Sequence, residues 1–156
     1  MPNPEDTGRR DFSSENGKLR VLVVDDDENI REILKDLLLM SGHHVILCSN
    51  GEEALQSFYE EEFDLVITDL GMPGISGWEV SRRIKRTHPQ KPVVIISGWG
   101  AQLSEEEIRS GQVDLVLPKP FNLDQILEIT ARFADKTAGE FTPEGVDNRE
   151  LQVQKT

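Results

Sequence analysis

The sequence predicts an α/β fold, a doubly wound five-stranded parallel sheet sandwiched by five helices. Five short segments are rich in β-branched residues and are apolar at consecutive positions. This pattern is typical of parallel strands that are covered on both faces. Segments with helical periodicity separate the five strands. Because strand and helix alternate along the chain, the strands are expected to be parallel and joined by right-handed crossovers.

The expected strands cover residues 19–24, 44–49, 64–69, 92–97 and 113–118. With their helices they define one predicted domain, residues 19–134. Residues 1–18 are polar and are expected to form a disordered N-terminal tail. Residues 135–156 show no sustained apolar period and are expected to form a flexible C-terminal tail, too short for an output domain.

The helices are expected to begin near residues 28, 51, 76, 104 and 122. Asp27 and Glu28 are interpreted as helix-start residues, because acids there favour the positive end of the helix dipole. The residues expected to face the core are Ile30, Ile33, Leu34, Leu37 and Leu38 in the first helix, Ala54, Leu55, Phe58 and Tyr59 in the second, and Leu123, Ile126, Leu127 and Thr130 in the last.

The composition restricts the classes of function. The net charge of −12 argues against a nucleic-acid surface, which needs a basic face. The apolar runs are too short to span a bilayer, the start is too polar for a signal peptide, and the single cysteine excludes an internal disulfide. We therefore expect a cytoplasmic protein with no nucleic-acid partner and no membrane partner.

Acidic residues follow two of the predicted strands. Asp25 and Asp26 come directly after the first strand, and Asp69 ends the third. In an open parallel sheet, ligands bind at the carboxyl ends of the strands. Three carboxylates there would repel one another, and Mg²⁺, which prefers oxygen ligands, would remove that repulsion. The sequence therefore predicts a magnesium site.

A carboxylate beside such a metal can attack phosphorus and form an acyl phosphate. Phosphoryl transfer then needs neutralisation of charge and fixed positions. Lys119, after the fifth strand, suits the first need, and the Ser97 hydroxyl, at the end of the fourth, suits the second. The tight turn at residues 71–74 could offer a backbone carbonyl to the metal.

The segments VLVVDDDENIREIL, DLVITDLGMPGISGWEV, VVIISGWG and LVLPKPF together resemble the receiver domain of two-component response regulators. The resemblance covers residues 19–134 and implies the flavodoxin-like fold of the chemotaxis protein CheY. It also implies a cis peptide between Lys119 and Pro120.

By this resemblance, Asp69 accepts a phosphoryl group from a histidine kinase or phosphotransfer protein. Asp25, Asp26, Asp69 and the Gly71 backbone carbonyl hold Mg²⁺, while Ser97 and Lys119 bind the phosphoryl group. The domain would then signal through protein contacts and catalyse only its own phosphorylation and dephosphorylation. It is either a stand-alone adaptor or part of a longer protein such as a hybrid histidine kinase.

Two positions depart from the family pattern. Val116 stands where the family has a switch aromatic, and its side chain cannot swing between exposed and buried poses. Trp99, two residues after Ser97, is expected to overhang the site and to limit the access of water to the acyl phosphate.

Two alternative functions remain open. A receiver fold that acts without phosphorylation would fit the valine at position 116. A haloacid-dehalogenase-type phosphatase would use Asp25 as its nucleophile, with Asp27 in the same motif. Against the phosphatase, Asn29 replaces the expected Thr or Val, no late acidic pair follows Lys119, and Asp69 has no role.

Other polar residues are expected to be structural. The histidines are interpreted as surface residues, and Cys48 as a small core residue. The bases at the end of the third helix are interpreted as a solvated face. These residues are His43, His44 and His88, and Arg82, Arg83, Lys85 and Arg86.

Overall fold

The computed structural model describes residues 17–98, 106 and 113–137. The strands in these residues are β1 (Arg20–Val24), β2 (His44–Cys48), β3 (Leu65–Asp69), β4 (Val93–Ser97) and β5 (Leu115–Pro118). The helices that lie wholly within these residues are α2 (Glu28–Met40), α3 (Gly51–Glu60), α4 (Gly77–Thr87) and α6 (Leu123–Thr137). Of the helix expected after Ser104, the structure describes residue 106 alone, which is helical; the rest lies outside the described residues.

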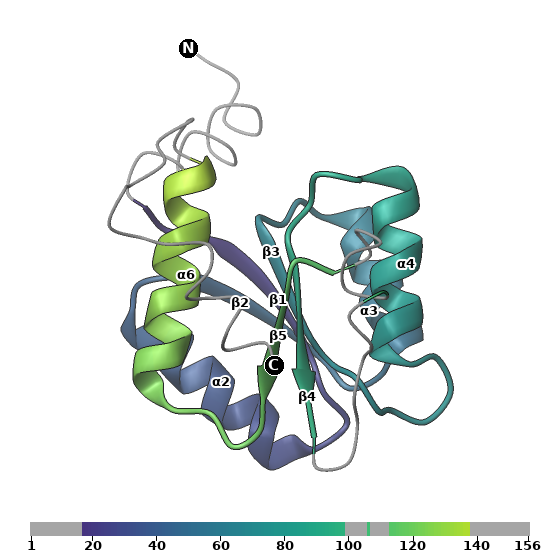
Figure 1. The fold of residues 1–156 in the computed structure, drawn as a ribbon, viewed down its shortest axis with the longest axis horizontal. Helices are drawn as coiled ribbons and strands as arrows, with labels where there is room; N and C mark the ends of the chain where they lie inside the picture. Colours follow the sequence, from purple (N-terminus) through teal and green to yellow (C-terminus); the bar gives the residue numbers. More distant parts are fainter. Residues whose placement is uncertain (1–16, 99–105, 107–112, 138–156) are drawn as a thin grey trace.

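The five strands form one parallel sheet in the order β2-β1-β3-β4-β5. Helices α2 and α6 lie on one side of it, and α3 and α4 lie on the other (Figure 1). The strand ends are in register, because Val24 pairs with both Cys48 and Thr68, and Ser97 pairs with Pro118. The chain leaves β1 toward β2 and later returns to β3 on the other side, so the switch point lies between β1 and β3.

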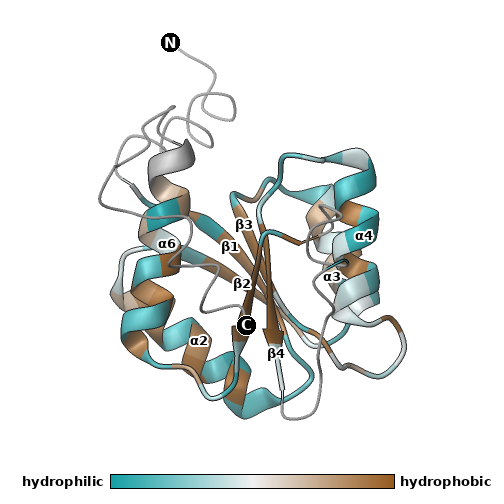
Figure 2. Cartoon of the chain, in the orientation of Figure 1, coloured by the Kyte–Doolittle hydropathy of each residue, from teal (hydrophilic) through white to brown (hydrophobic). Residues whose placement is uncertain are grey.

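Each central strand is buried on both faces, as its apolar sequence predicts. Val21 and Val23 of β1 pack into the core beneath α2 and α6, while Leu22 and Val24 pack into the core beneath α3 and α4. Figure 2 shows the strands as mostly hydrophobic, while the helices carry both hydrophobic and hydrophilic residues. The doubly wound parallel sheet predicted from the sequence is confirmed.

The helices begin at side-chain caps that the sequence supplies. Asp27 accepts a hydrogen bond from the Asn29 N–H, so its predicted helix-start role is confirmed. Asn50 and Ser76 cap α3 and α4 through the N–H groups three residues on. Before α6, Asn122 and Gln125 exchange two bonds of 2.9 Å, a capping-box arrangement.

The predicted apolar faces are partly wrong. Tyr59 is 52% exposed, and its hydroxyl contacts Arg83 O and Thr87 Oγ1 on α4 instead of packing into the core. Ile33 of α2 and Leu123 and Leu127 of α6 are also exposed. The buried face of α6 is turned toward the residues Ile126, Ile129, Thr130, Phe133 and Ala134.

Lys85 does not belong to the solvated face of α4. Its ammonium is buried and lies 2.6 Å from Asp114 Oδ2 and 2.7 Å from the Lys91 carbonyl oxygen. Asp114 Oδ2 also accepts the Val93 N–H. The buried charge is therefore paired, and it joins α4 to the amino ends of β4 and β5.

His43 is likewise buried, which contradicts the surface interpretation. Gly42, with a φ of 90°, ends α2 and turns the chain so that the His43 ring faces the start of β1. There Nδ1 accepts the Leu19 N–H at 2.9 Å. The neutral ring then carries its proton on Nε2, because a backbone N–H can only donate.

This arrangement makes stability depend on pH. Burial, with smaller effects of His44 and Lys18, lowers the pKa of His43 below its ordinary 6.5. The unfolded chain therefore binds more protons than the folded chain below about pH 6.5, and stability falls as the pH falls through that range. Protonation removes the acceptor for Leu19, a loss of about 1–3 kcal/mol. We expect the free energy of unfolding, measured in urea, to decrease from pH 7 to pH 5 in the wild type. We expect this decrease to be smaller in His43→Asn.

The exposed neighbour His44 provides the control for that experiment. His44→Gln removes only a minor influence on the pKa of His43 and is expected to keep most of the wild-type pH dependence. Asp25 and Asp69 titrate equally in all three proteins, so the difference between them reports on His43. Equal pH dependence in His43→Asn and the wild type would contradict the role given to this ring.

Candidate functional site

Three carboxylates meet at the carboxyl edge of the sheet, beside the switch point. Asp25 follows β1 and is fully buried, Asp69 ends β3 and is 5% exposed, and Asp26 is exposed. Each offers an oxygen, and these oxygens lie within 4.8 Å of one another. The structure thus brings together the three acids that the strand ends predicted.

Backbone hydrogen bonds hold Asp25 in place, but one of its carboxylate oxygens receives no hydrogen bond. Its N–H donates to the Cys48 carbonyl at 3.1 Å, and its Oδ1 accepts the Asp27 N–H at 2.8 Å. Asp25 Oδ2 is buried and has no hydrogen-bond partner among the described residues. A buried carboxylate oxygen without a hydrogen bond is costly unless a positive charge lies beside it.

Lys119 supplies a positive charge to this edge. Its Nζ lies 3.1 Å from Asp69 Oδ1 and 3.5 Å from Asp25 Oδ2. Its backbone N–H donates to the Ser97 carbonyl at 2.9 Å, which ties the end of β5 to the end of β4. The expected cis peptide between Lys119 and Pro120 is present.

Burial and the neighbouring charges shift the pKa values of the acids and of the lysine at this edge. Burial raises the pKa of Asp69, Lys119 opposes this, and the charge of Asp26 adds to the increase. Burial likewise raises the pKa of Asp25. Burial alone would lower the pKa of Lys119, but the carboxylates of Asp69 and Asp25 raise it more. The site therefore carries excess negative charge that a bound cation would relieve.

The side chains fit a small, hard divalent cation. The donors are carboxylate oxygens alone, without nitrogen or sulfur. Asp25 Oδ2 has no hydrogen bond and has the Lys119 ammonium at 3.5 Å. Mg²⁺ typically binds through one or two carboxylates and keeps open positions for waters and phosphate oxygens. Gly71, on the loop after Asp69, is exposed, and a β-carbon on it would meet nothing within 4 Å. Among the described residues, nothing crowds position 71.

Ser97 lies at the same edge. It is the last residue of β4, it is 8% exposed, and its strand neighbour Ile96 pairs with Asp69. Val116, on β5, is buried with Ile95 and packs near Trp78. Position 116 is therefore a core position in this chain. The expectation for Trp99 concerns a residue outside those that the structure describes.

Gly77 has a role at this edge that was not predicted from the sequence. This residue begins α4, and its N–H donates to the Leu70 carbonyl at 2.9 Å. A β-carbon on Gly77 would collide with the carbonyl of Asp69. The missing side chain lets the helix start lie directly against the backbone of Asp69. A glycine just inside a helix, where its propensity is poor, is the signal that indicates such a close approach.

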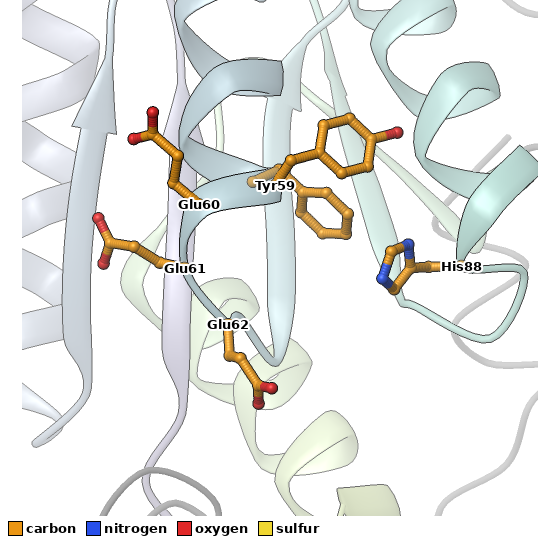
Figure 3. A pocket seen from close by; sticks show the side chains of 6 residues that line it. Tyr59, Glu60, Glu61, Glu62 and His88 are labelled. Atoms are coloured by element: carbon orange, nitrogen blue, oxygen red, sulfur yellow. The ribbon is translucent and has the colours of Figure 1, made fainter. Parts of the chain in front are cut away.

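A surface pocket of about 460 Å³ lies elsewhere, at the end of α3 and the end of α4. Its lining includes Tyr59, His88 and the three acids at 60–62, which precede β3 and thus lie at the amino edge of the sheet. Figure 3 shows the side chains of Glu60 and Glu61 directed away from His88. This pocket is separate from the carboxylate site.

A family model described as the response regulator receiver domain matches residues 21–131. The chain belongs to the response regulator receiver family. Response regulator protein FleR of Pseudomonas aeruginosa is 37% identical to this receiver domain over 116 residues, which are 74% of this chain and 24% of FleR. Transcriptional regulatory protein CpxR of Escherichia coli K12 is 36% identical over 103 residues, 66% of this chain and 44% of CpxR.

Solved receiver structures have the same fold. Response regulator protein TrrA of Thermotoga maritima, solved in complex with Mg²⁺-BeF, matches with a TM-score of 0.68 and 37% identity, over 73% of this chain and 97% of TrrA. Chemotaxis response regulator CheY4 of Vibrio cholerae matches with a TM-score of 0.67 and 26% identity, over 74% of this chain and 98% of CheY4. The CheY-like fold expected from the resemblance is confirmed.

The alignments cover much less of the curated relatives, 24% of FleR and 44% of CpxR. The receiver domain is therefore the part that this chain shares with them. Among the residues that the structure describes, each helix is too short or too polar to span a bilayer.

Proposed function

We propose that this receiver domain is the phosphoacceptor of a two-component phosphorelay and that Asp69 takes the phosphoryl group. The observation that carries the proposal is the Asp69 carboxylate, buried at a strand end, 3.1 Å from the Lys119 ammonium and beside Asp25 and Asp26. The donor is a histidine kinase or a phosphotransfer protein. The phosphorylated domain then acts through contacts with another protein.

The proposed reaction is an in-line displacement at phosphorus. An oxygen of Asp69 forms a bond to phosphorus, the bond from phosphorus to the donor's histidine nitrogen breaks, and that nitrogen leaves with the electron pair. Lys119 then pairs with a phosphoryl oxygen, and the Ser97 hydroxyl donates to another. Such fixed donors lower the barrier where charge develops.

The bound metal would be Mg²⁺, held by the carboxylates of Asp25, Asp26 and Asp69 and the Gly71 carbonyl, and it would neutralise charge on the phosphoryl oxygens. Asp25 and Asp26 serve this role by converging with Asp69 on one point. The complex of TrrA with Mg²⁺-BeF supports the same assignment here.

The geometry favours this function over a phosphatase that uses Asp25. Asp25 is buried and its Oδ1 already accepts the Asp27 N–H, whereas Asp69 Oδ1 lies 3.1 Å from the Lys119 ammonium. The second acid of a phosphatase motif would be Asp27, but its Oδ1 caps α2 through the Asn29 N–H. Between Asp25 and Asp69, these contacts favour Asp69 as the nucleophile.

Phosphorylation by a small donor tests the proposal without knowledge of the natural kinase. We expect acetyl phosphate to give a hydroxylamine-sensitive acyl phosphate when Mg²⁺ is present and none when EDTA removes it, measured by intact-protein mass spectrometry. A chain that binds Mg²⁺ but takes no label would instead support the phosphorylation-independent module. Equal labelling in EDTA would contradict the metal assignment.

A further inference from the structure

Arg31 turns its side chain back from the first turn of α2 to the end of β1. Its Nη1 donates to the backbone carbonyl of Asp25 at 2.7 Å, and its own N–H donates to the Asp27 carbonyl at 3.0 Å. The guanidinium is always charged, and a hydrogen bond from a charged donor is about twice as strong as a neutral one. Arg31 therefore links the start of α2 to the turn at Asp25 that follows β1.

The Arg31 hydrogen bond is one of several that fix the backbone of residues 25–31. Asp25 Oδ1 accepts the Asp27 N–H, and Asp27 Oδ1 accepts the Asn29 N–H. The Asp25 N–H is bound to the Cys48 carbonyl of β2. With Arg31 on its carbonyl, the Asp25 residue is held on its amide, its carboxylate and its carbonyl.

Arg31 and Lys119 act on the acids in different ways. Lys119 lies against the carboxylate oxygens of Asp25 and Asp69, the atoms that would bind a metal. The Arg31 bond goes to a main-chain oxygen and leaves those carboxylate atoms available. Arg31 can thus support the site while a cation is bound.

We propose that Arg31 is a positioning residue of the metal site, which clamps the Asp25 carbonyl so that the carboxylates of Asp25 and Asp26 converge with Asp69. This inference rests on the proposed function and adds a residue to it. Groups that orient metal ligands contribute about 10- to 100-fold to metal affinity. The clamp therefore acts on Mg²⁺ affinity, with Asp69 itself untouched.

The test is titration of the full chain with Mg²⁺ by calorimetry. Arg31→Met is expected to weaken Mg²⁺ binding about tenfold. Since Arg31 makes one bond to the carbonyl, a lysine can supply the donor, and Arg31→Lys is expected to recover most of the affinity. Lys35→Met is the matched control, because Lys35 lies one turn further along α2, pairs with Glu32 and carries the same charge.

A second measurement separates positioning from general damage to the fold. In labelling by acetyl phosphate, the Mg²⁺ concentration for half-maximal rate is expected to rise about tenfold in Arg31→Met, while the rate at saturating Mg²⁺ stays at the wild-type value. Loss of rate at every Mg²⁺ concentration would overturn the positioning role, as would equal weakening in Lys35→Met.

Two outcomes distinguish this inference from the proposed function. If the wild type binds Mg²⁺ and takes label but Arg31→Met and Arg31→Lys bind Mg²⁺ as tightly as it does, the inference is wrong and the proposed function stands. If the wild type neither binds Mg²⁺ nor takes label, the proposed function fails and the inference fails with it.

Discussion

Gly77→Ala is expected to lower the free energy of unfolding by about 3 kcal/mol, the upper part of the range for overpacking. The added β-carbon collides with the Asp69 carbonyl and also meets Leu70 Cα at 3.0 Å, and both are backbone groups that cannot rotate away. Helix propensity alone would favour alanine by about 1 kcal/mol, so the two effects have opposite signs. Unfolding in urea measures which of them is larger.

Gly71→Ala is the control for stability, because a β-carbon there meets nothing within 4 Å. It is expected to change the free energy of unfolding by less than about 0.5 kcal/mol. The Gly77 variant is also expected to take label more slowly than the wild type, since the collision displaces Asp69 itself. A Gly77→Ala protein as stable as the wild type would show that α4 does not lie against Asp69.

Lys119→Met is expected to slow phosphorylation by roughly 100- to 1,000-fold, the cost of removing one fixed charge from a developing anion. Mg²⁺ binding is expected to tighten in the same protein, because the Lys119 ammonium now lies 3.1 Å from Asp69 and 3.5 Å from Asp25, where it repels an incoming cation. Labelling kinetics and calorimetry measure the two effects separately.

The matched control is again Lys35→Met, which removes a lysine that pairs with Glu32 away from the sheet edge. It is expected to leave both quantities unchanged. If Lys119→Met weakened Mg²⁺ binding, the ammonium would be supporting the metal site and not opposing it. An unchanged labelling rate would remove Lys119 from the phosphoryl chemistry.

The fold could be predicted because strands that are buried on both faces are apolar at consecutive positions, a pattern that the sequence shows directly. Runs such as residues 93–96 are apolar at consecutive positions, and caps such as Asp27 mark where a helix begins. Periodicity was less informative about the edges of an apolar stripe. It could not show that Tyr59 and Leu127 lie just outside the buried face, because that depends on how each helix is rotated against the sheet.

The buried polar residues were harder to predict. His43 and Lys85 are polar in sequence, and each is buried because a partner far along the chain, Leu19 N–H or Asp114, satisfies it. Such pairs leave no recognisable pattern in the neighbouring sequence, so only the tertiary structure shows them.

The acids of the site could be predicted because parallel strands end at one edge. That rule places Asp25, Asp26, Asp69 and Lys119 together from their positions in the sequence. It could not identify Gly77 or Arg31, whose contacts are with backbone carbonyls of the site residues. The roles of Ser97 and Gly71 toward a phosphoryl group and a metal stay predictions.

Locating the phosphoryl group tests the central claim most directly. The wild type, Asp69→Asn and Asp25→Asn would each be incubated with acetyl phosphate and Mg²⁺, and the modified residue would be identified by reduction with borohydride and peptide mass spectrometry. We predict label on Asp69 in the wild type, no label in Asp69→Asn, and weaker, more Mg²⁺-demanding labelling of Asp69 in Asp25→Asn. Label on Asp25, or undiminished labelling of Asp69→Asn, would contradict the account.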